Sequence, residues 1–189
     1  MYYNDVMIDI ETTGTHVDNN AIIQIAGVKF NLETRDVCSD TFDRCLHMAP
    51  NRYMEESCRT DFWGKIPKVF QEIVERSEDP QKVMHDFINW ATASDMNPQG
   101  VRFWAKPITF DYAFIASYCR QFNLKMPFHY RVARDMNSYI AGLSGCADHP
   151  KIDKEIPFEG QEHHALWDSF HQIKVLFAAQ DRYIKAEVL

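Results

Sequence analysis

DVMIDIETTG, residues 5–14, is the stretch that decides the fold of this chain. Apolar residues at positions 6, 8 and 10 alternate with residues 7, 9 and 11, and this period of two predicts a β-strand over Asp5–Glu11. The Thr12-Thr13-Gly14 run that follows is typical of a turn. One face of the predicted strand is therefore apolar, whereas the other carries two carboxylates, Asp9 and Glu11.

The segments on either side of this strand predict an α/β fold. Two further apolar runs, at Ala21–Phe30 and Thr41–Leu46, indicate strands that form an antiparallel meander with the first. Spacings of three and four then predict helices, and short apolar runs predict two more strands. The helices are expected at Pro67–Arg76, Pro80–Trp90, Phe110–Phe122, Met136–Leu143 and Ala165–Ile184, the strands at Val101–Ala105 and Tyr130–Ala133, and a long loop at Ser144–Gln161. We expect a mixed five-stranded sheet flanked by helices.

Composition favours one globular domain over residues 1–189, because 46% of the residues are hydrophobic and 13% are aromatic. No apolar run approaches the roughly 20 residues of a membrane span, and the first residues lack the basic start and cleavage site of a signal peptide. We therefore expect a cytoplasmic protein without a membrane partner. The five cysteines are scattered and include no C-x-x-C pair, which favours reduced thiols over a zinc or redox site.

The net charge of -7 argues against a protein that binds nucleic acid non-specifically through a basic surface. The segment from Arg102 to Arg134 is an exception, because it carries six basic residues against a single acid, Asp111. The pattern is compatible with two interpretations. The basic residues bind the phosphates of a nucleic acid along this segment, or they are solvated charges on the surface of helices and loops.

Asp9 and Glu11 form the most informative pair. Residues two apart on a strand project from the same face at a separation of roughly 6–7 Å. Two carboxylates that close either raise each other's pKa or bind a cation, and a divalent metal with a preference for oxygen ligands is the simplest such cation. The alternative is an edge strand with a solvated acidic face.

Further candidates for the same site lie far along the chain. Asp111 falls in the first turn of a predicted helix, where the helix dipole alone would stabilise a carboxylate. The run from His163 to Asp168 places two imidazoles before a helix and a carboxylate about one turn into it, an arrangement that suits proton transfer next to a metal. His164 and Asp168 are also spaced as a helix-stabilising i, i+4 pair.

Three motifs together resemble those of the DEDDh exonucleases, the relatives of RNase T, oligoribonuclease and the polymerase proofreading subunit. The motifs are DIETTG at residues 9–14, Phe110-Asp111, and H-x-A-x-x-D at residues 163–168. The resemblance implies an RNase H-like fold and a 3'-5' exonuclease in which His163 is the general base. Four acids would hold two Mg²⁺ or Mn²⁺ ions, namely Asp9, Glu11, Asp111 and Asp168. His164 has no equivalent role in the motif.

The chain departs from the family pattern at Lys106-Pro107, because many relatives carry an asparagine shortly before the second-motif aspartate. It is most similar to a compact phage and bacterial branch that includes exonuclease VIII-like deoxyribonucleases and a mycobacterial-type exoribonuclease. Members of this branch tend to dimerise, so a homodimer is one expectation. The choice between RNA and DNA stays open at this point.

The resemblance implies a substrate of single-stranded nucleic acid or 3' overhangs, released as nucleoside 5'-monophosphates. Aromatic rings stack on bases of any sequence, and we expect Phe62 or Trp63 to do so, with Trp167 as a further candidate. The turn residues Thr12, Thr13 and Gly14 are also predicted substrate contacts. Trp90 and Trp104 lie among periodic apolar neighbours, which favours core packing.

Two alternative functions compete with this interpretation. A nucleic-acid-binding module without catalysis would be expected to have lost one of the acids or the histidine, and all five are present. A proofreading-type subunit of a larger complex would need a docking tail or linker.

Overall fold

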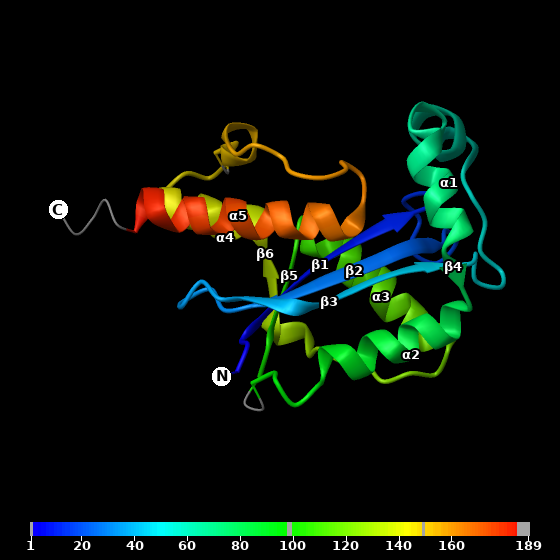
Figure 1. Ribbon diagram of the computed structural model, residues 1–189, viewed down its shortest axis with the longest axis horizontal. Helices are drawn as coiled ribbons and strands as arrows, with labels where there is room; N and C mark the ends of the chain where they lie inside the picture. The colour runs from blue at the N-terminus through cyan, green and yellow to red at the C-terminus, as the bar shows by residue number, and fades with distance from the viewer. Residues whose placement is uncertain (1, 98–99, 149, 185–189) are drawn as a thin grey trace.

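The first strand, β1 (Asp5–Thr12), lies inside a six-stranded mixed sheet with the order β4-β3-β2-β1-β5-β6. The computed structural model describes residues 2–97, 100–148 and 150–184 (Figure 1). The other strands are β2 (Ile22–Phe30), β3 (Val37–Leu46), β4 (Ser77–Glu78), β5 (Arg102–Ala105) and β6 (Ala133–Asp135). The first three strands form the predicted antiparallel meander, and β4, β5 and β6 join it in parallel.

The α/β class and the mixed sheet are confirmed, but the expected count of five strands is wrong. The sixth strand, β4, is two residues long and parallel to the end of β3, which is too short to leave a periodic signal. The strand predicted at Tyr130–Ala133 is also misplaced. Residues Tyr130–Val132 form a 3₁₀ turn, η3, in which the His129 side chain accepts a hydrogen bond from the Arg131 amide, and β6 begins only at Ala133.

Among the residues that the structure describes, five α-helices cover the sheet: α1 (Pro67–Glu75), α2 (Pro80–Ala91), α3 (Ile108–Gln121), α4 (Met136–Ser144) and α5 (Ala165–Tyr183). Their positions follow the sequence prediction to within two residues at each end. Short helices occur at η1 (Cys58–Phe62), a π-helix, and at the 3₁₀ turns η2 (Trp63–Lys65) and η4 (Ile152–Glu155). Within the loop predicted at 144–161, the described residues include the 3₁₀ turn η4.

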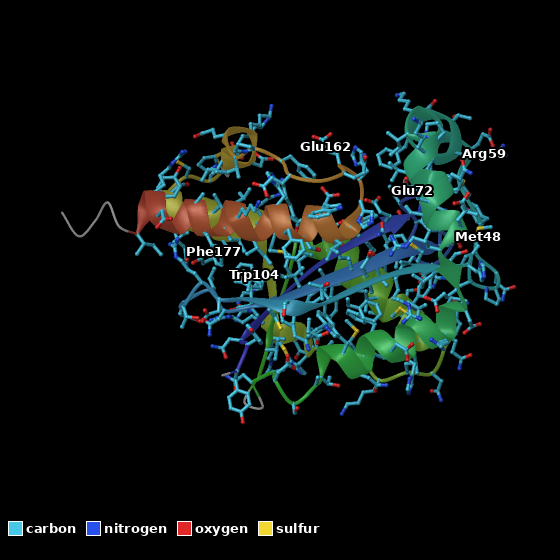
Figure 2. The ribbon with its side chains drawn as sticks, in the orientation of Figure 1. Met48, Arg59, Glu72, Trp104, Glu162 and Phe177 are labelled. Atoms are coloured by element: carbon cyan, nitrogen blue, oxygen red, sulfur yellow. The ribbon has the colours of Figure 1, made fainter. Side chains whose placement is uncertain are left out.

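The two faces of the sheet bury separate apolar layers. Alternation along β1 sends Val6, Ile8 and Ile10 toward α2 and α3, and Met7 toward α4 and α5. Figure 1 shows α4 and α5 on one side of the sheet and α2 on the other. Figure 2 shows Trp104 and Phe177 between the sheet and α5, where Trp104 is almost fully buried as predicted. Each fully buried side chain of this kind contributes about 1.5–3 kcal/mol to folding.

The start of β1 is anchored by a buried carboxylate. Asp5 accepts hydrogen bonds from Arg102 at 2.6 and 2.7 Å, from the Trp104 indole at 2.7 Å and from the Leu32 amide at 3.0 Å. Because Arg102 holds a fully buried acid, its charge is structural and does not belong to a phosphate path. No helix among the described residues has the length and apolar character needed to cross a bilayer.

Candidate active site

The end of β1 carries the predicted acidic pair. Since β1 lies between β2 and β5, the alternative of a solvated edge strand is wrong. Asp9 is half-buried, and Glu11 is only 8% exposed. Asp168, in the first turn of α5, completes a group of three carboxylates whose ligand oxygens all lie within 4.8 Å of one another. Asp168 thus shares one small volume with two acids that lie more than 150 residues earlier in the chain.

Asp111 reaches the same site from α3. It is 3% exposed, and its Oδ1 accepts a hydrogen bond of 3.1 Å from the backbone amide of Ile10. A solvated acid stabilised only by the helix dipole would be exposed, so this burial corrects that interpretation. The four acids line one cavity of about 300 Å³ together with Ile10, Lys106, Phe110, His163 and Gln172.

Burial dominates the electrostatics of the four acids. It raises the pKa of Glu11 to about 8, with further contributions from the charges of Asp168 and Asp111. Burial also raises the pKa of Asp111 to about 8 and that of Asp168 to about 6. The pKa of Asp9 is raised by burial and then by the charges of Asp111, Glu11 and Asp168. Four carboxylates so placed cannot all ionise at neutral pH without a compensating cation.

The donor set fits a divalent cation that prefers oxygen ligands. One member of the site, Gln172, was not found from the sequence. Its amide Nε2 donates a hydrogen bond of 2.8 Å to Asp9 Oδ1, while its buried Oε1 has no hydrogen-bond partner among the described residues. Because Gln172 lines the cavity of the four acids, this oxygen is a candidate ligand for a cation or a hydrogen-bond acceptor for its waters. The sequence indicates only that Gln172 shares a helix face with Asp168, which it follows by one turn, and its bond to Asp9 depends on how the helix docks.

The two neighbouring histidines have different surroundings. His163 is exposed, adopts a positive φ of 59° and lines the cavity of the four acids. Its ring contacts Phe62 edge-on with a centroid distance of 4.9 Å. His164 precedes α5 as its N-cap residue and points elsewhere: its ring nitrogens lie 3.3 and 3.4 Å from Gln24 Nε2, and its Nε2 lies 3.9 Å from Asp43 Oδ2. The helical pairing of His164 with Asp168 is therefore replaced by contacts to β2 and β3.

A second cavity, of about 400 Å³, adjoins the first along Glu11 and Phe110. Thr12, Gly14 and Phe62 also line it, and their contact with substrate stays a prediction. Gly14 has no room for a side chain, because a Cβ would overlap Asn20 and Glu55.

Two of the predicted substrate contacts are internal. The Thr13 side chain is fully buried and bonds to the Tyr53 carbonyl at 2.8 Å and to the Ala21 amide at 2.7 Å. Trp63 is 2% exposed, and its indole donates to the Thr12 carbonyl at 3.0 Å. These burials correct the expectation that both residues touch substrate, since each supports the turn after β1 from within. Trp167, by contrast, is 40% exposed.

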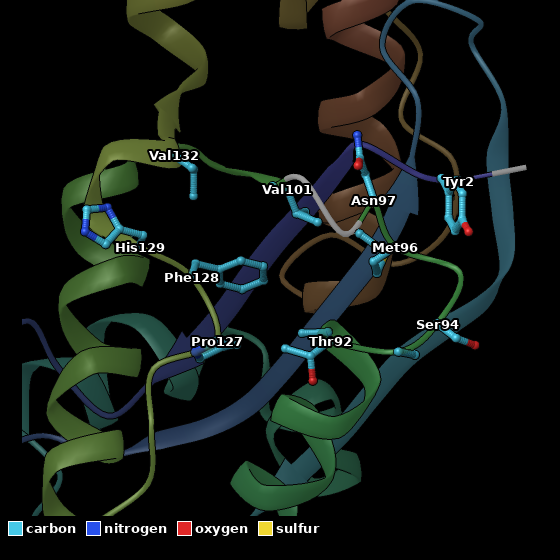
Figure 3. Close-up of a pocket in the computed structure, with 13 residues that line it drawn as sticks. Tyr2, Thr92, Ser94, Met96, Asn97, Val101, Pro127, Phe128, His129 and Val132 are labelled. Atoms are coloured by element: carbon cyan, nitrogen blue, oxygen red, sulfur yellow. The ribbon is translucent and has the colours of Figure 1, made fainter.

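A third cavity, larger than these two at about 590 Å³, lies apart from the acidic site (Figure 3). Its wall is mostly apolar, with Met96, Val101, Phe128 and Val132 around it and Tyr2 and His129 at its sides. None of the four acids lines it. Volume alone therefore does not identify the reactive site of this fold.

Comparison with protein families finds a match over residues 4–180 to the model described as 3'-5' exoribonuclease Rv2179c-like domain. Comparison with curated proteins finds no match.

Solved structures with the same fold include several nucleases. E. coli exonuclease I in a zinc-bound complex with single-stranded DNA is 16% identical, with a TM-score of 0.72 over 96% of this chain and 41% of that one. S. pombe Pop2p in a Mg²⁺- and Mn²⁺-bound form is 15% identical, with a TM-score of 0.70 over 96% and 84%. The nuclease domain of 3'hExo, a DEDDh family member bound to rAMP, is 18% identical, with a TM-score of 0.64 over 96% and 94%.

The chain thus spans less than half of exonuclease I but nearly all of the 3'hExo nuclease domain. At these identities the likeness establishes the fold, which is the RNase H-like exonuclease fold that the motifs predict.

Proposed function

The chain belongs to the Rv2179c-like family of 3'-5' exoribonuclease domains, and from this membership we propose that it removes nucleoside 5'-monophosphates from the 3' end of single-stranded nucleic acid or 3' overhangs. The observation that carries the proposal is the convergence of Asp9, Glu11 and Asp168 within 4.8 Å, with Asp111 on the same cavity. This cluster forms from three separate elements, β1, α3 and α5.

The four acids would hold two divalent cations, and Mg²⁺ or Mn²⁺ suits their hard oxygen ligands. Such ions would supply the charge that stabilises the departing 3' oxygen and make the attacking water more acidic. Gln172 orients the Asp9 carboxylate through its 2.8 Å hydrogen bond. The support for Mg²⁺ or Mn²⁺ is the ligand chemistry together with the ions bound in the S. pombe relative.

His163 is the proposed general base. It is exposed at the cavity wall next to Asp168, so it can take a proton from an attacking water while its ring packs against Phe62. The water oxygen then bonds to phosphorus, the bond from phosphorus to the 3' oxygen breaks, that oxygen takes a proton from solvent, and His163 releases its own proton to solvent. His164 is held by Gln24 and Asp43 and takes no part in this transfer.

The terminal base would occupy the cavity between Phe62 and Phe110, beside Glu11. Stacking on a ring contributes about 1–3 kcal/mol per base without reading sequence. We place RNA first among the substrates because the family is described as one of exoribonucleases. The single-stranded DNA bound by exonuclease I makes DNA the alternative to test.

A digestion series tests the proposal. Matched 5'-labelled single-stranded RNA, single-stranded DNA and duplexes with 3' overhangs are incubated with Mg²⁺, Mn²⁺ or EDTA. We expect a ladder that shortens from the 3' end only with metal, no reaction on an oligonucleotide with a blocked 3' end, and no activity for Asp9→Asn. Cleavage that starts internally would refute the proposed function. Cleavage by the wild-type protein in EDTA, or by Asp9→Asn with metal, would also refute it.

A further inference from the structure

Lys106 occupies a position that the family resemblance does not explain. It directly follows β5, whose parallel register with β1 pairs Met7 with Trp104. Continuing that register by two residues brings Lys106 level with Asp9 and on the same face of the sheet, because side chains alternate with a period of two. In agreement, Lys106 lines the cavity of the four acids.

Lys106 is the only lysine or arginine among the described residues that line this cavity. Two divalent cations would balance the four carboxylates and leave the incoming phosphodiester as an uncompensated negative charge. The negative charge on the phosphate grows as it is attacked. A cation on the cavity wall would therefore stabilise the transition state more than it stabilises the bound substrate. Lys106 is the side chain placed to supply it.

The ammonium of Lys106 has a resting partner. It lies 2.9 Å from Asp153 Oδ2, on the short turn η4, and the two side chains are 27% and 29% exposed. Both side chains keep part of their surface in water, so the ammonium stays solvated while it exchanges its partner. Lys106 also borders a neighbouring hollow of about 460 Å³ that His163 and Asp168 share, so it stands where the two spaces meet.

We propose that Lys106 is a phosphate-binding residue, whose ammonium moves from Asp153 to a non-bridging oxygen of the scissile phosphate when substrate enters. The proposal rests on the proposed exonuclease function and adds a residue to its site. The competing interpretation is a structural ion pair, in which Lys106 serves only to hold η4 against the sheet. The two interpretations give opposite results when Asp153 is changed.

The experiment compares wild-type protein with Lys106→Met, Lys106→Arg and Asp153→Asn. Binding of a single-stranded oligoribonucleotide with a phosphorothioate 3' linkage is measured by fluorescence anisotropy over a range of salt concentrations, and turnover is measured on the unmodified oligonucleotide. Mn²⁺ binding without nucleic acid and the thermal midpoint of unfolding serve as controls for the metal site and the fold.

We expect Lys106→Met to lower turnover by about 10²-fold and to reduce the slope of log K against log salt by about 0.7, the value of one phosphate contact on a single strand. Lys106→Arg should recover part of the turnover and part of the slope. Asp153→Asn should keep the wild-type slope and bind the oligonucleotide at least as tightly as the wild-type protein. Equal losses in Lys106→Met and Asp153→Asn, or an unchanged slope in Lys106→Met, would overturn the proposal. Wild-type protein that degrades nothing with either metal would instead overturn the exonuclease function itself.

Discussion

The side-chain amide of Gln172 donates a 2.8 Å hydrogen bond to the Oδ1 atom of Asp9, across 163 positions of sequence. The bond joins the middle of α5 to the centre of the acidic cluster. Because Gln172 lies one turn after Asp168, the same helix face supplies both an acid and the group that orients another acid. The geometry of the proposed metal site therefore depends on how α5 docks on β1.

Replacing Gln172 with Ala should weaken divalent metal binding by about 10–100-fold, the usual effect of losing a group that orients a ligand. Isothermal titration calorimetry with Mn²⁺ measures the affinity of each variant. Gln180→Ala is the matched control, since Gln180 lies two turns further along α5 and bonds to Tyr139 instead. Equal metal affinity in the wild-type protein and Gln172→Ala would mean that Asp9 needs no orienting partner.

His163→Ala should reduce turnover by about 10²–10⁴-fold while leaving Mn²⁺ affinity within about twofold, because a general base transfers a proton without holding the metal. His129→Ala is the control, since His129 lines the distant cavity of Figure 3. Turnover is followed by release of nucleoside monophosphate. A fully active His163→Ala variant would contradict its role as the base.

The metal-free protein should lose stability as the pH rises from about 5 to 9. The raised pKa values of Asp168, about 6, and of Glu11 and Asp111, about 8, mean that the folded state retains protons that the unfolded chain has released above its usual carboxyl pKa of about 4. The stability that these protonated acids contribute is fully present below the unfolded pKa of about 4. It is lost as the pH rises through the folded pKa values.

Thermal unfolding in EDTA across this pH range checks the prediction. Asp111→Asn keeps an acceptor for the Ile10 amide but removes one titrating group, so its stability should fall less steeply. Adding Mn²⁺ should restore stability most at high pH, where the ionised acids bind the ion best. A flat profile in EDTA would show that the acids remain ionised without a cation.

Much of this fold could be predicted from the sequence because β1 to β3 and the helices carry long periodic patterns. Short elements were not predicted correctly. The strand β4 has only two residues, and the strand expected from Tyr130 begins only at Ala133. In the candidate site, local chemistry predicted Asp9 and Glu11. The position of Asp111 against Ile10 and the bond from Gln172 to Asp9 depend on long-range docking, which no local pattern encodes.

Phe62 and Trp63 are adjacent, yet their replacement should have opposite consequences. Phe62 lines the cavity beside Glu11, so Phe62→Ala should weaken oligonucleotide binding by about 1–3 kcal/mol with little loss of stability. Trp63 is buried and bonds to Thr12, so Trp63→Ala should lower the free energy of unfolding by about 3–5 kcal/mol. Anisotropy and urea unfolding separate the two effects, and a large stability loss in Phe62→Ala would place its ring in the core.

Gly160 should matter for catalysis although it lies outside the cavity of the four acids. It lies three residues before His163 and has a positive φ of 94°, and a Cβ at this position would overlap the indole ring of Trp167, which is next to Asp168. Gly160→Ala should therefore push the His163 loop away from α5 and lower kcat.

Residues 159–163 are all exposed, and exposed loops open locally at little cost to global stability, so the thermal midpoint of Gly160→Ala should change little. Gly142→Ala is the control, because Gly142 lies in α4 with open space around its Cα, where alanine should stabilise the helix by about 0.5–1 kcal/mol without affecting kcat. Combining Gly160→Ala with Trp167→Ala removes the overlapping ring and should recover part of the lost kcat. If the double variant is no faster than Gly160→Ala, the backbone conformation of Gly160, and not its contact with Trp167, sets the position of His163.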